Sequence, residues 1–322
     1  MENTYTSVEV SPGMAEKIME LLASGGGNQS IQSSSESDSS DSSISPSLEA
    51  LEKYTKTLTL SDTRTLETLG KTTQPHNLCP NLQRLHIYST AFSTNVEEAL
   101  DADQAGARLR DLLRVFTRLV PSVPHAVFSF SPGEFLVTAD EPERGLPSII
   151  TLRQKAVVPI LLPVDTLTFL LPSALYTESE WTSFGDLVKL YELALCWVPR
   201  NKVRFVFEFN QALTGAKQMG KVFSRLILVA GEIYGEKPYP AVKLEIVIPY
   251  KAGFTEPIAK TLTTRLYGIM GATLEACRAH ELEGDGKEIG ERGEEEWRRI
   301  MRYWEGGNVE IKGMGEEDIA NA

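Results

Sequence analysis

Two patterns of apolar and polar positions run through the chain between residues 48 and 280. In the first, short runs rich in β-branched and aromatic residues alternate apolar with polar side chains, which is typical of strands. In the second, apolar residues recur every three or four positions, as they do on one face of a helix. The predicted strands are KTLTL (56–60), LQRLHIY (82–88), HAVFSF (125–130), DTLTFLL (165–171), VRFVFEF (203–209) and KLEIVIPY (243–250).

Helical periodicity occupies most of the stretches between these strands. The predicted helices span 103–120, 180–197, 215–235 and 256 to about 280. The clearest of them, 103–120, carries one apolar stripe, while Arg108, Arg114 and Arg118 lie off that stripe and are expected to form a solvated face. Alternating strands and helices predict an α/β fold of parallel strands joined by right-handed crossovers.

The segments on either side of this region have a different composition. Residues 1–47 combine a short amphipathic helix (14–24), expected to be ordered by docking on a partner or on the body of the protein, with a Gly- and Ser-rich tract (25–47) that is predicted to be disordered. Residues 281–322 begin as an acidic, Gly- and Glu-rich linker. A C-terminal amphipathic helix follows in EEEWRRIMRYWEG. The sequence thus predicts three regions, 1–47, 48–280 and 281–322.

Composition and charge narrow the classes of partner. The chain of 322 residues has a formal net charge of -12 and a pI near 5.0, which disfavours binding to nucleic acid or to an anionic membrane surface. The N-terminus does not resemble a secretory signal, and no apolar run is long enough to span a bilayer. We therefore expect a cytoplasmic or nuclear protein that binds neither membranes nor nucleic acid.

Metal-binding and nucleophilic chemistry find little support in the sequence. Its 3 cysteines and 4 histidines are widely spaced, so neither a disulfide framework nor a metal site is predicted. There is no Ser in a G-x-S-x-G elbow, and Cys196 and Cys277 lie on apolar helix faces, where a thiol is a small buried hydrophobe. No catalytic residue, metal ligand or cofactor is predicted.

The stretch GAKQMGK fits the G-x-x-x-x-G-K spacing of a phosphate-binding loop, with Gly215, Gly220 and Lys221 as the cofactor-binding candidates. The next residue is Val222, whereas such a loop needs Ser or Thr to hold Mg²⁺, and the loop interior favours a helix. The alternative interpretation is a helix capped by Thr214. A small-ligand site at the carboxyl ends of parallel strands, near 210–220 or 250–255, stays open as a second possibility.

The stretch LCPNLQRLHIY (78–88) places apolar residues in the order L-x-x-x-L-x-x-L-x-I. It resembles a leucine-rich repeat unit, in particular the irregular kind that ends in CPNLxxLxI in F-box substrate receptors and related fungal proteins. Upstream, LTLSDTRTLETLG (58–70) looks like the preceding repeat. The resemblance covers about residues 56–90, and it does not extend to an F-box, because MAEKIMELLAS leads directly into the serine tract without a Leu-Pro-x-Glu start.

This resemblance implies a parallel-strand solenoid, with the open α/β sheet as the other form of the same fold class. A curved stack has helices on one side only, whereas a flat twisted sheet is covered on both faces. The function implied is recognition of a protein partner, without catalysis, through outward-pointing strand residues. The residues expected in that role are Gln83, Arg84, His86, Tyr88, Arg204 and Glu208. The alternative function is an α/β enzyme or small-ligand-binding domain.

Overall fold

The computed structural model describes residues 7–23, 48–73, 75–91, 102–129, 160–171, 194–207, 216–235, 242–250 and 291–315, with parts of 260–275. These residues form an α/β fold around an open eight-stranded sheet in the order β1-β2-β3-β4-β6-β8-β9-β10. Its strands are parallel and helices lie between them, which confirms the predicted fold class. The order of the strands in the sheet follows the sequence without a reversal.

The chain divides into two compact units, Met1–Phe128 and Ser129–Ala322. The first unit includes strand and helix residues that precede residue 48, and the second includes helix and strand residues that follow residue 280. The serine-rich tract 25–47 lies outside the described residues. Within the described residues, no helix is both long enough and apolar enough to cross a membrane.

The first unit contains four strands of the sheet and the helices that connect them. Its elements are β1 (Ser7–Glu9), α1 (Pro12–Ala23), α2 (Leu48–Tyr54), β2 (Thr57–Leu60), α3 (Thr63–Gly70), β3 (Arg84–Tyr88), a 3-10 turn (Ser89–Ala91), α4 (Ala102–Arg114), a π-helical turn (Val115–Leu119) and β4 (His125–Ser129), whose last residue lies beyond the boundary.

The second unit contains the remaining strands of the large sheet and a small parallel pair, β5 with β7. Its elements are β5 (Ile160–Leu161), β6 (Thr166–Leu171), β7 (Trp197–Val198), β8 (Lys202–Phe207), α7 (Ala216–Tyr234), β9 (Lys243–Tyr250), α9 (Glu291–Glu305) and β10 (Val309–Gly315).

Short polar side chains fix the start of α3 against the strands of the first unit. The Asp62 carboxylate accepts a hydrogen bond from the Thr65 backbone N–H at 2.9 Å, which is the usual N-cap arrangement. The Thr65 hydroxyl donates to the Val10 carbonyl oxygen at 3.3 Å and so ties the helix to the residue after β1. Apolar residues of the adjoining strands are fully buried, among them Leu58 and Leu85.

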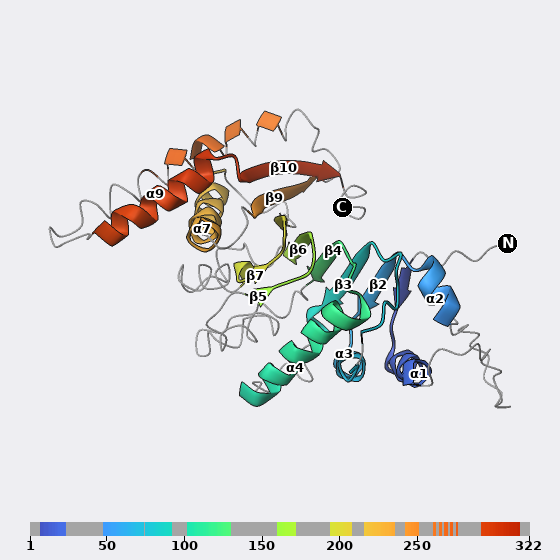
Figure 1. Ribbon diagram of the computed structural model, residues 1–322. Coiled ribbons are helices and arrows are strands. Elements are labelled where there is room, and N and C mark those ends of the chain that lie inside the picture. Colours follow the sequence, from blue (N-terminus) through green and yellow to red (C-terminus); the bar gives the residue numbers. More distant parts are fainter. Residues whose placement is uncertain are drawn as a thin grey trace, which may run out of the picture. The chain divides into compact units, whose positions relative to one another are not determined.

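Helices α1, α3 and α4 lie side by side on one face of the strands of the first unit (Figure 1). Arg64 of α3 pairs with Glu16 of α1 at 2.9 Å. The last residue of α3, Gly70, contacts α4 so closely that a side chain there would overlap Asp111. In α1, Ala15 and other apolar positions are buried, so this helix docks on the body of the protein.

The predicted solvated face is wrong for Arg108, which is buried, whereas the side chain of Arg114 is 46% exposed. Arg108 is buried and pairs with Glu67 at 2.8 Å. Arg114 Nη1 donates to the Gly70 carbonyl oxygen at 3.1 Å, and Arg118 Nη1 donates to the Thr72 carbonyl oxygen at 3.2 Å. These carbonyls lie at the C-terminal end of α3, where unpaired backbone acceptors and the helix dipole favour a cation.

In the second unit, α7 and α9 also pack against each other. The ring of Phe223 on α7 lies 5.0 Å from that of Phe207 on β8, so α7 covers the face of β8 that carries Phe207. At Gly231 of α7 an added Cβ would lie 3.0 Å from the Ile300 Cα of α9, which shows how close the two helices are. The Tyr303 hydroxyl of α9 donates to the Val242 carbonyl oxygen at 2.7 Å.

Three local differences from the predicted elements have a structural reason. The predicted helix 180–197 does not reach its end, because Trp197 and Val198 form β7 and pair with β5. Strand β1 was not expected in SVE, and it forms by pairing with β2. Strand β10 was not expected in the Gly-containing stretch VEIKGMG, and it pairs with β9 along its whole length.

Candidate functional site

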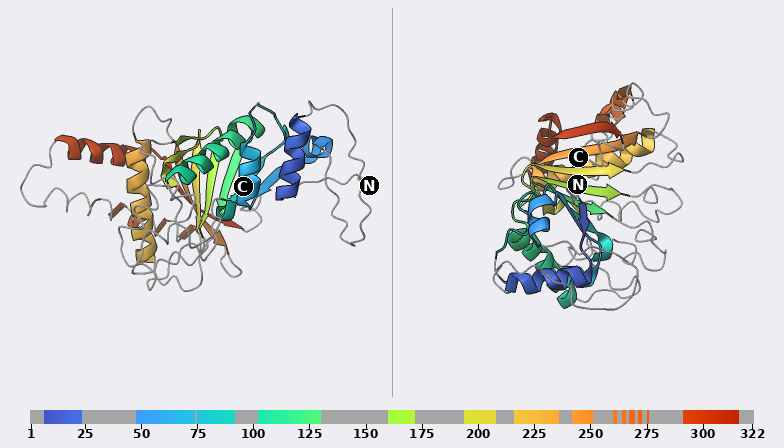
Figure 2. Two further views of the ribbon diagram at one scale, coloured as in Figure 1. Left: turned by 90° about the horizontal axis from the view of Figure 1, so that it is seen from below. Right: turned by 90° about the vertical axis from the view of Figure 1, so that its right-hand side faces the viewer.

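Strand β3 presents polar and aromatic side chains on the face opposite its buried apolar side chains. Arg84, His86 and Tyr88 alternate with Leu85 and Ile87, whose side chains are fully buried, and successive strand residues point to opposite faces. Figure 2 shows the strands of the first unit with α1, α3 and α4 on one side of them. The predicted partner-binding residues of this strand therefore share one face.

The parallel register extends this face across the neighbouring strands. Thr57 of β2 lies opposite Arg84, and Thr59 lies opposite His86. In the next pair, Glu9 of β1 lies opposite Thr59. We call this surface the first strand face, and it comprises Glu9, Thr57, Thr59, Arg84, His86 and Tyr88.

An aromatic pair is the most exposed apolar part of the first strand face. The rings of His86 and Tyr88 are stacked with their centroids 4.5 Å apart. Tyr88 is 37% exposed, which is unusual for a large apolar side chain in the described residues. Burial, followed by the Arg84 charge, lowers the pKa of His86 to about 4, so this imidazole is neutral at pH 7.

The other predicted partner-binding residues have different environments. Gln83 is exposed immediately before β3, and its backbone N–H donates to the Lys56 carbonyl oxygen at 2.8 Å. Arg204 lies on β8, on the face opposite Phe205 and Phe207, but it is buried rather than outward-facing, because it pairs with a buried glutamate of the next strand. Glu208 lies outside the described residues.

That glutamate is the centre of a group of charged residues on β8, β9 and β10. Glu245 of β9 is 1% exposed and contacts three cations: Arg204 through its Nε, Lys202 at 3.4 Å and Lys312 at 2.7 Å. Lys312 also pairs with the exposed Glu310 at 3.1 Å. We call this group the basic cluster, and together with the exposed Lys243 it comprises Lys202, Arg204, Lys243, Glu245, Glu310 and Lys312.

Electrostatics keep the buried carboxylate of the basic cluster charged. Burial by itself would raise the pKa of Glu245, but hydrogen bonds from Lys312 and Arg204 and the Lys202 charge hold it below its ordinary value. Partial burial by itself would lower the pKa of Lys312, but hydrogen bonds to Glu245 and Glu310 and the charges of both carboxylates raise it. The signal available in the sequence was the charge at every second position in KVR, KLE and VEIK, but only the strand register shows that these charges meet.

The predicted phosphate-binding stretch is helical where it is described. Helix α7 begins at Ala216, so Gly220 and Lys221 lie within its first turns, while Gly215 lies outside the described residues. A helix uses most of its backbone N–H groups internally, so residues 216–221 do not form the open loop that cradles a phosphate. Residues 216–221 are therefore helical, as the alternative interpretation of this stretch predicts.

The described thiol of Cys79 does not have the environment of a nucleophile. Burial, with a contribution from the Glu52 charge, raises the pKa of the Cys79 thiol to about 12, so the thiolate is scarce at neutral pH. Cys196 is half-buried, and Cys277 lies outside the described residues. Across the described ranges, no group of three or more His, Cys, Asp or Glu residues is arranged to hold a metal ion.

Comparison of the chain with protein-family models, with curated proteins and with solved structures finds no match.

Proposed function

We propose that the chain is a non-catalytic protein-interaction module that binds a protein partner through the first strand face. The observation that carries this proposal is the one-sided arrangement of the first unit. Helices α1, α3 and α4 lie together on one face of the strands (Figure 1), and Arg84, His86 and Tyr88 alternate along β3 with the buried Leu85 and Ile87. A face of this kind displays its side chains directly to a partner protein.

Strand order supports the same function. When parallel neighbours follow the sequence and every crossover is right-handed, the connecting helices fall on the same face. In a doubly wound sheet the order reverses, and the ligand binds in the crevice at the reversal. Within the first unit the order β1-β2-β3-β4 contains no reversal. This is the arrangement expected of a leucine-rich-repeat-like scaffold, of the kind that the stretch 78–88 resembles.

The chemistry of the first strand face suits a protein partner. Tyr and Arg side chains are over-represented among the residues that dominate binding energies at protein interfaces. Tyr88 offers an exposed aromatic surface supported by the stacked His86. Because the His86 imidazole is neutral, covering it with a partner does not require a charged group to be removed from water. Arg84 adds a planar donor next to this pair, two residues before His86 on the same strand.

The alternative function, an α/β enzyme or ligand-binding domain, stays a prediction. Its two candidate locations, 210–220 and 250–255, fall largely outside the described residues. The described part of the first is the start of α7, and that of the second is the last residue of β9.

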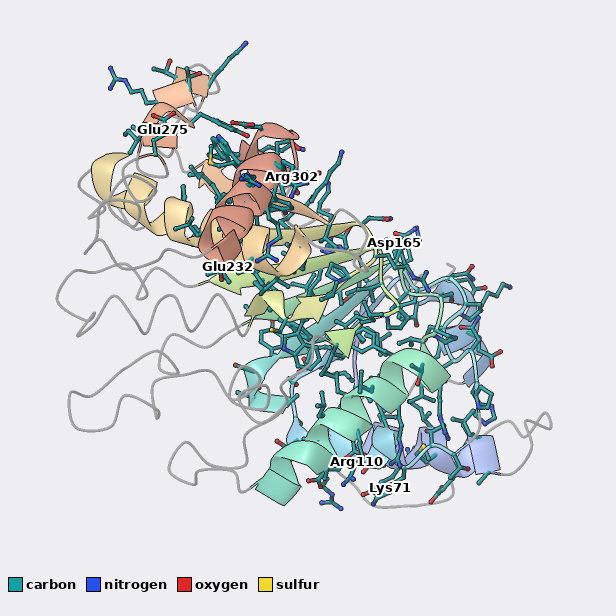
Figure 3. The ribbon with its side chains drawn as sticks, turned by 60° about the vertical axis from the view of Figure 1, so that its left-hand side comes forward. Lys71, Arg110, Asp165, Glu232, Glu275 and Arg302 are labelled. Carbon is teal, nitrogen blue, oxygen red and sulfur yellow. The ribbon has the colours of Figure 1, made fainter. Side chains whose placement is uncertain are left out.

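The test of the proposed function is affinity purification from native lysate with the full chain as bait. Tyr88→Ala and Arg84→Ala probe the first strand face. Arg110→Ala is the matched control, because Arg110 is an exposed arginine of α4 on the helix side of the same unit (Figure 3). We expect the wild type and Arg110→Ala to co-purify the same partner protein in stoichiometric amount. The amount that co-purifies with Tyr88→Ala should be about tenfold lower.

Two results would overturn the proposed function. One is the absence of any stoichiometric protein in the wild-type purification, and the other is a partner that both strand-face variants retain in full. Circular dichroism of each purified variant shows whether a loss of binding reflects a loss of fold.

A further inference from the structure

Cations outnumber carboxylates in the basic cluster, although the chain as a whole carries a net charge of -12. Glu245 accepts contacts from Lys202, Arg204 and Lys312, and Glu310 compensates only Lys312. The exposed Lys243 has no ion pair in the part of the chain that the structure describes. A local positive excess on an acidic protein concentrates attraction for an anionic partner at this place.

The arrangement of the basic cluster separates a buried anchor from accessible cations. The Glu245 carboxylate is 1% exposed, whereas the side chains of Lys202 and Lys312 are 28% and 38% exposed. Both ammonium groups lie within 3.4 Å of the same Glu245 oxygen, and each has three N–H donors of which this oxygen uses one. Lys312 uses a second N–H for Glu310, at 3.1 Å, which leaves it one donor, and Lys202 keeps two, for a carboxylate that approaches from solvent.

Strand geometry spaces the accessible cations for an extended chain. Lys243 lies opposite Lys202 in the parallel register, and Lys312 lies opposite Val247, four positions further along the same face of β9. At a rise of about 3.3 Å per residue, the backbone levels of Lys243 and Val247 are about 13 Å apart, while the ammonium groups of Lys202 and Lys312 converge on one Glu245 oxygen between these levels. An extended peptide also presents every second side chain on one side, so acidic residues at alternate positions can meet both levels.

We infer that the basic cluster binds an extended acidic segment of a partner protein. This inference rests on the proposed function, because it names the chemistry of a partner and gives it a second contact surface. An acidic peptide fits better than nucleic acid, because a long polyanion is repelled by the net charge of -12, whereas a short acidic stretch interacts mainly with the local cluster. Asp165 and Arg200, which precede β6 and β8, form an ion pair at 3.8 Å. Because one carries a negative charge and the other a positive charge, this pair adds no net charge.

The experiment measures fluorescence anisotropy of a labelled synthetic peptide of alternating Glu and Ser residues on addition of the purified full chain. A peptide of alternating Gln and Ser residues is the uncharged control. We expect the acidic peptide to bind, the Gln peptide not to bind, and the affinity to fall as salt is added.

Three variants locate the binding. Lys243→Glu should weaken peptide binding by about fivefold or more, because an exposed attraction becomes a repulsion. Lys312→Gln should weaken it by about twofold to threefold, because it removes one exposed cation without adding a charge. Lys260→Glu is the matched control, since Lys260 is an exposed lysine of the segment between β9 and α9 and should leave binding unchanged. The thermal midpoint of Lys243→Glu confirms that it is folded.

The inference is overturned if the acidic peptide does not bind, if Lys243→Glu and Lys260→Glu weaken it equally, or if an oligothymidylate of similar charge binds more tightly. Its failure can be told apart from failure of the proposed function. Tyr88→Ala should leave peptide binding intact. If a partner is captured in a Tyr88-dependent way but the acidic peptide does not bind, only this inference is rejected. If the peptide binds but no Tyr88-dependent partner is captured, only the proposed role of the first strand face is rejected.

Discussion

At the scale of single residues, two buried or half-buried titratable groups distinguish the two strand faces. Glu245 stays charged because three cations surround it, and His86 stays neutral because burial and the Arg84 charge oppose its protonation. Both effects act between side chains on one face of a strand and its neighbours. Each can therefore be tested by changing a single side chain.

Glu245→Gln should destabilise the protein, because it removes the negative charge that compensates a buried arginine. Breaking a buried ion pair from one side costs about 3–5 kcal/mol, and because Lys202 and Lys312 are partly exposed we expect about 2–3 kcal/mol here. Urea unfolding followed by circular dichroism measures the change. Glu310→Gln is the control, and at 54% exposure it should cost less than about 0.5 kcal/mol. Equal losses in the two variants would show that Glu245 is not the anchor of the basic cluster.

The loss caused by Glu245→Gln should depend on pH in the acid range. The folded-state pKa of Glu245 lies below its ordinary value of 4.5, so the charged carboxylate contributes stability above pH 4.5 that is lost as pH falls through the folded-state pKa. The difference in unfolding free energy between wild type and variant should therefore be full at neutral pH and shrink below pH 4.5. A difference that stays constant down to pH 3 would contradict the role of the charge.

The His86 imidazole should titrate near pH 4 in the folded protein rather than near 6.5. Because the unfolded chain takes up the proton first, the neutral His86 contributes stability above pH 6.5 that is lost as pH falls towards 4. Proton NMR of the imidazole signals measures the midpoint, and the spectrum of His86→Gln identifies which signal belongs to His86. A midpoint between pH 6 and 7 would show that His86 is more exposed than the structure has it.

At the scale of secondary-structure elements, the sequence identified those whose pattern is local. The strands β2, β3, β4, β6, β8 and β9 and the helices α4, α7 and α9 were predicted close to their observed bounds. Strand β1 has only three residues and β10 contains glycines, so neither shows a strand pattern without its partner strand. The burial of Arg108 was missed because helical periodicity does not reveal an ion pair with another helix.

The same limit applies to the candidate sites. The three β3 residues of the first strand face could be predicted, since strand alternation alone places Arg84, His86 and Tyr88 opposite Leu85 and Ile87. The basic cluster could not, because Lys202, Glu245 and Lys312 come together only through the register of three strands that are far apart in the sequence. Alternation along a strand assigns each side chain to a face of the sheet, but it does not show which strand lies beside it or in which register.

Two glycines should respond to alanine with opposite signs, because they differ in their surroundings. At Gly70 a methyl group would overlap Asp111 of α4, so Gly70→Ala should cost about 1–3 kcal/mol of stability. At Gly13, in α1, no atom lies within 4 Å of the added Cβ, so Gly13→Ala should gain up to about 1 kcal/mol from helix propensity. Thermal unfolding of both variants measures the two changes. A loss in both would mean that backbone conformation rather than helix contact controls the effect.

At the scale of the whole molecule, the order of the strands follows the order of the sequence. Each described strand pair in the large sheet joins strands that are close in this order, such as β1 with β2 or β8 with β9. In architectures where each element contacts only its neighbours, stability is set by local terms, and a change at one place weakens with distance along the array. A doubly wound sheet mixes early and late strands and lacks this property.

Hydrogen exchange of the Glu245→Gln variant tests whether stability is distributed in this way. The lost charge lies among β8, β9 and β10, so amide exchange should increase most in those strands and in α7 and α9, which pack beside them. In β1, β2 and β3, which pair with one another, the increase should be smaller. Mass spectrometry of peptides from both regions measures the two increases in one sample. An equal increase everywhere would show that the chain opens as a single cooperative unit, and the nearest-neighbour description would then be wrong.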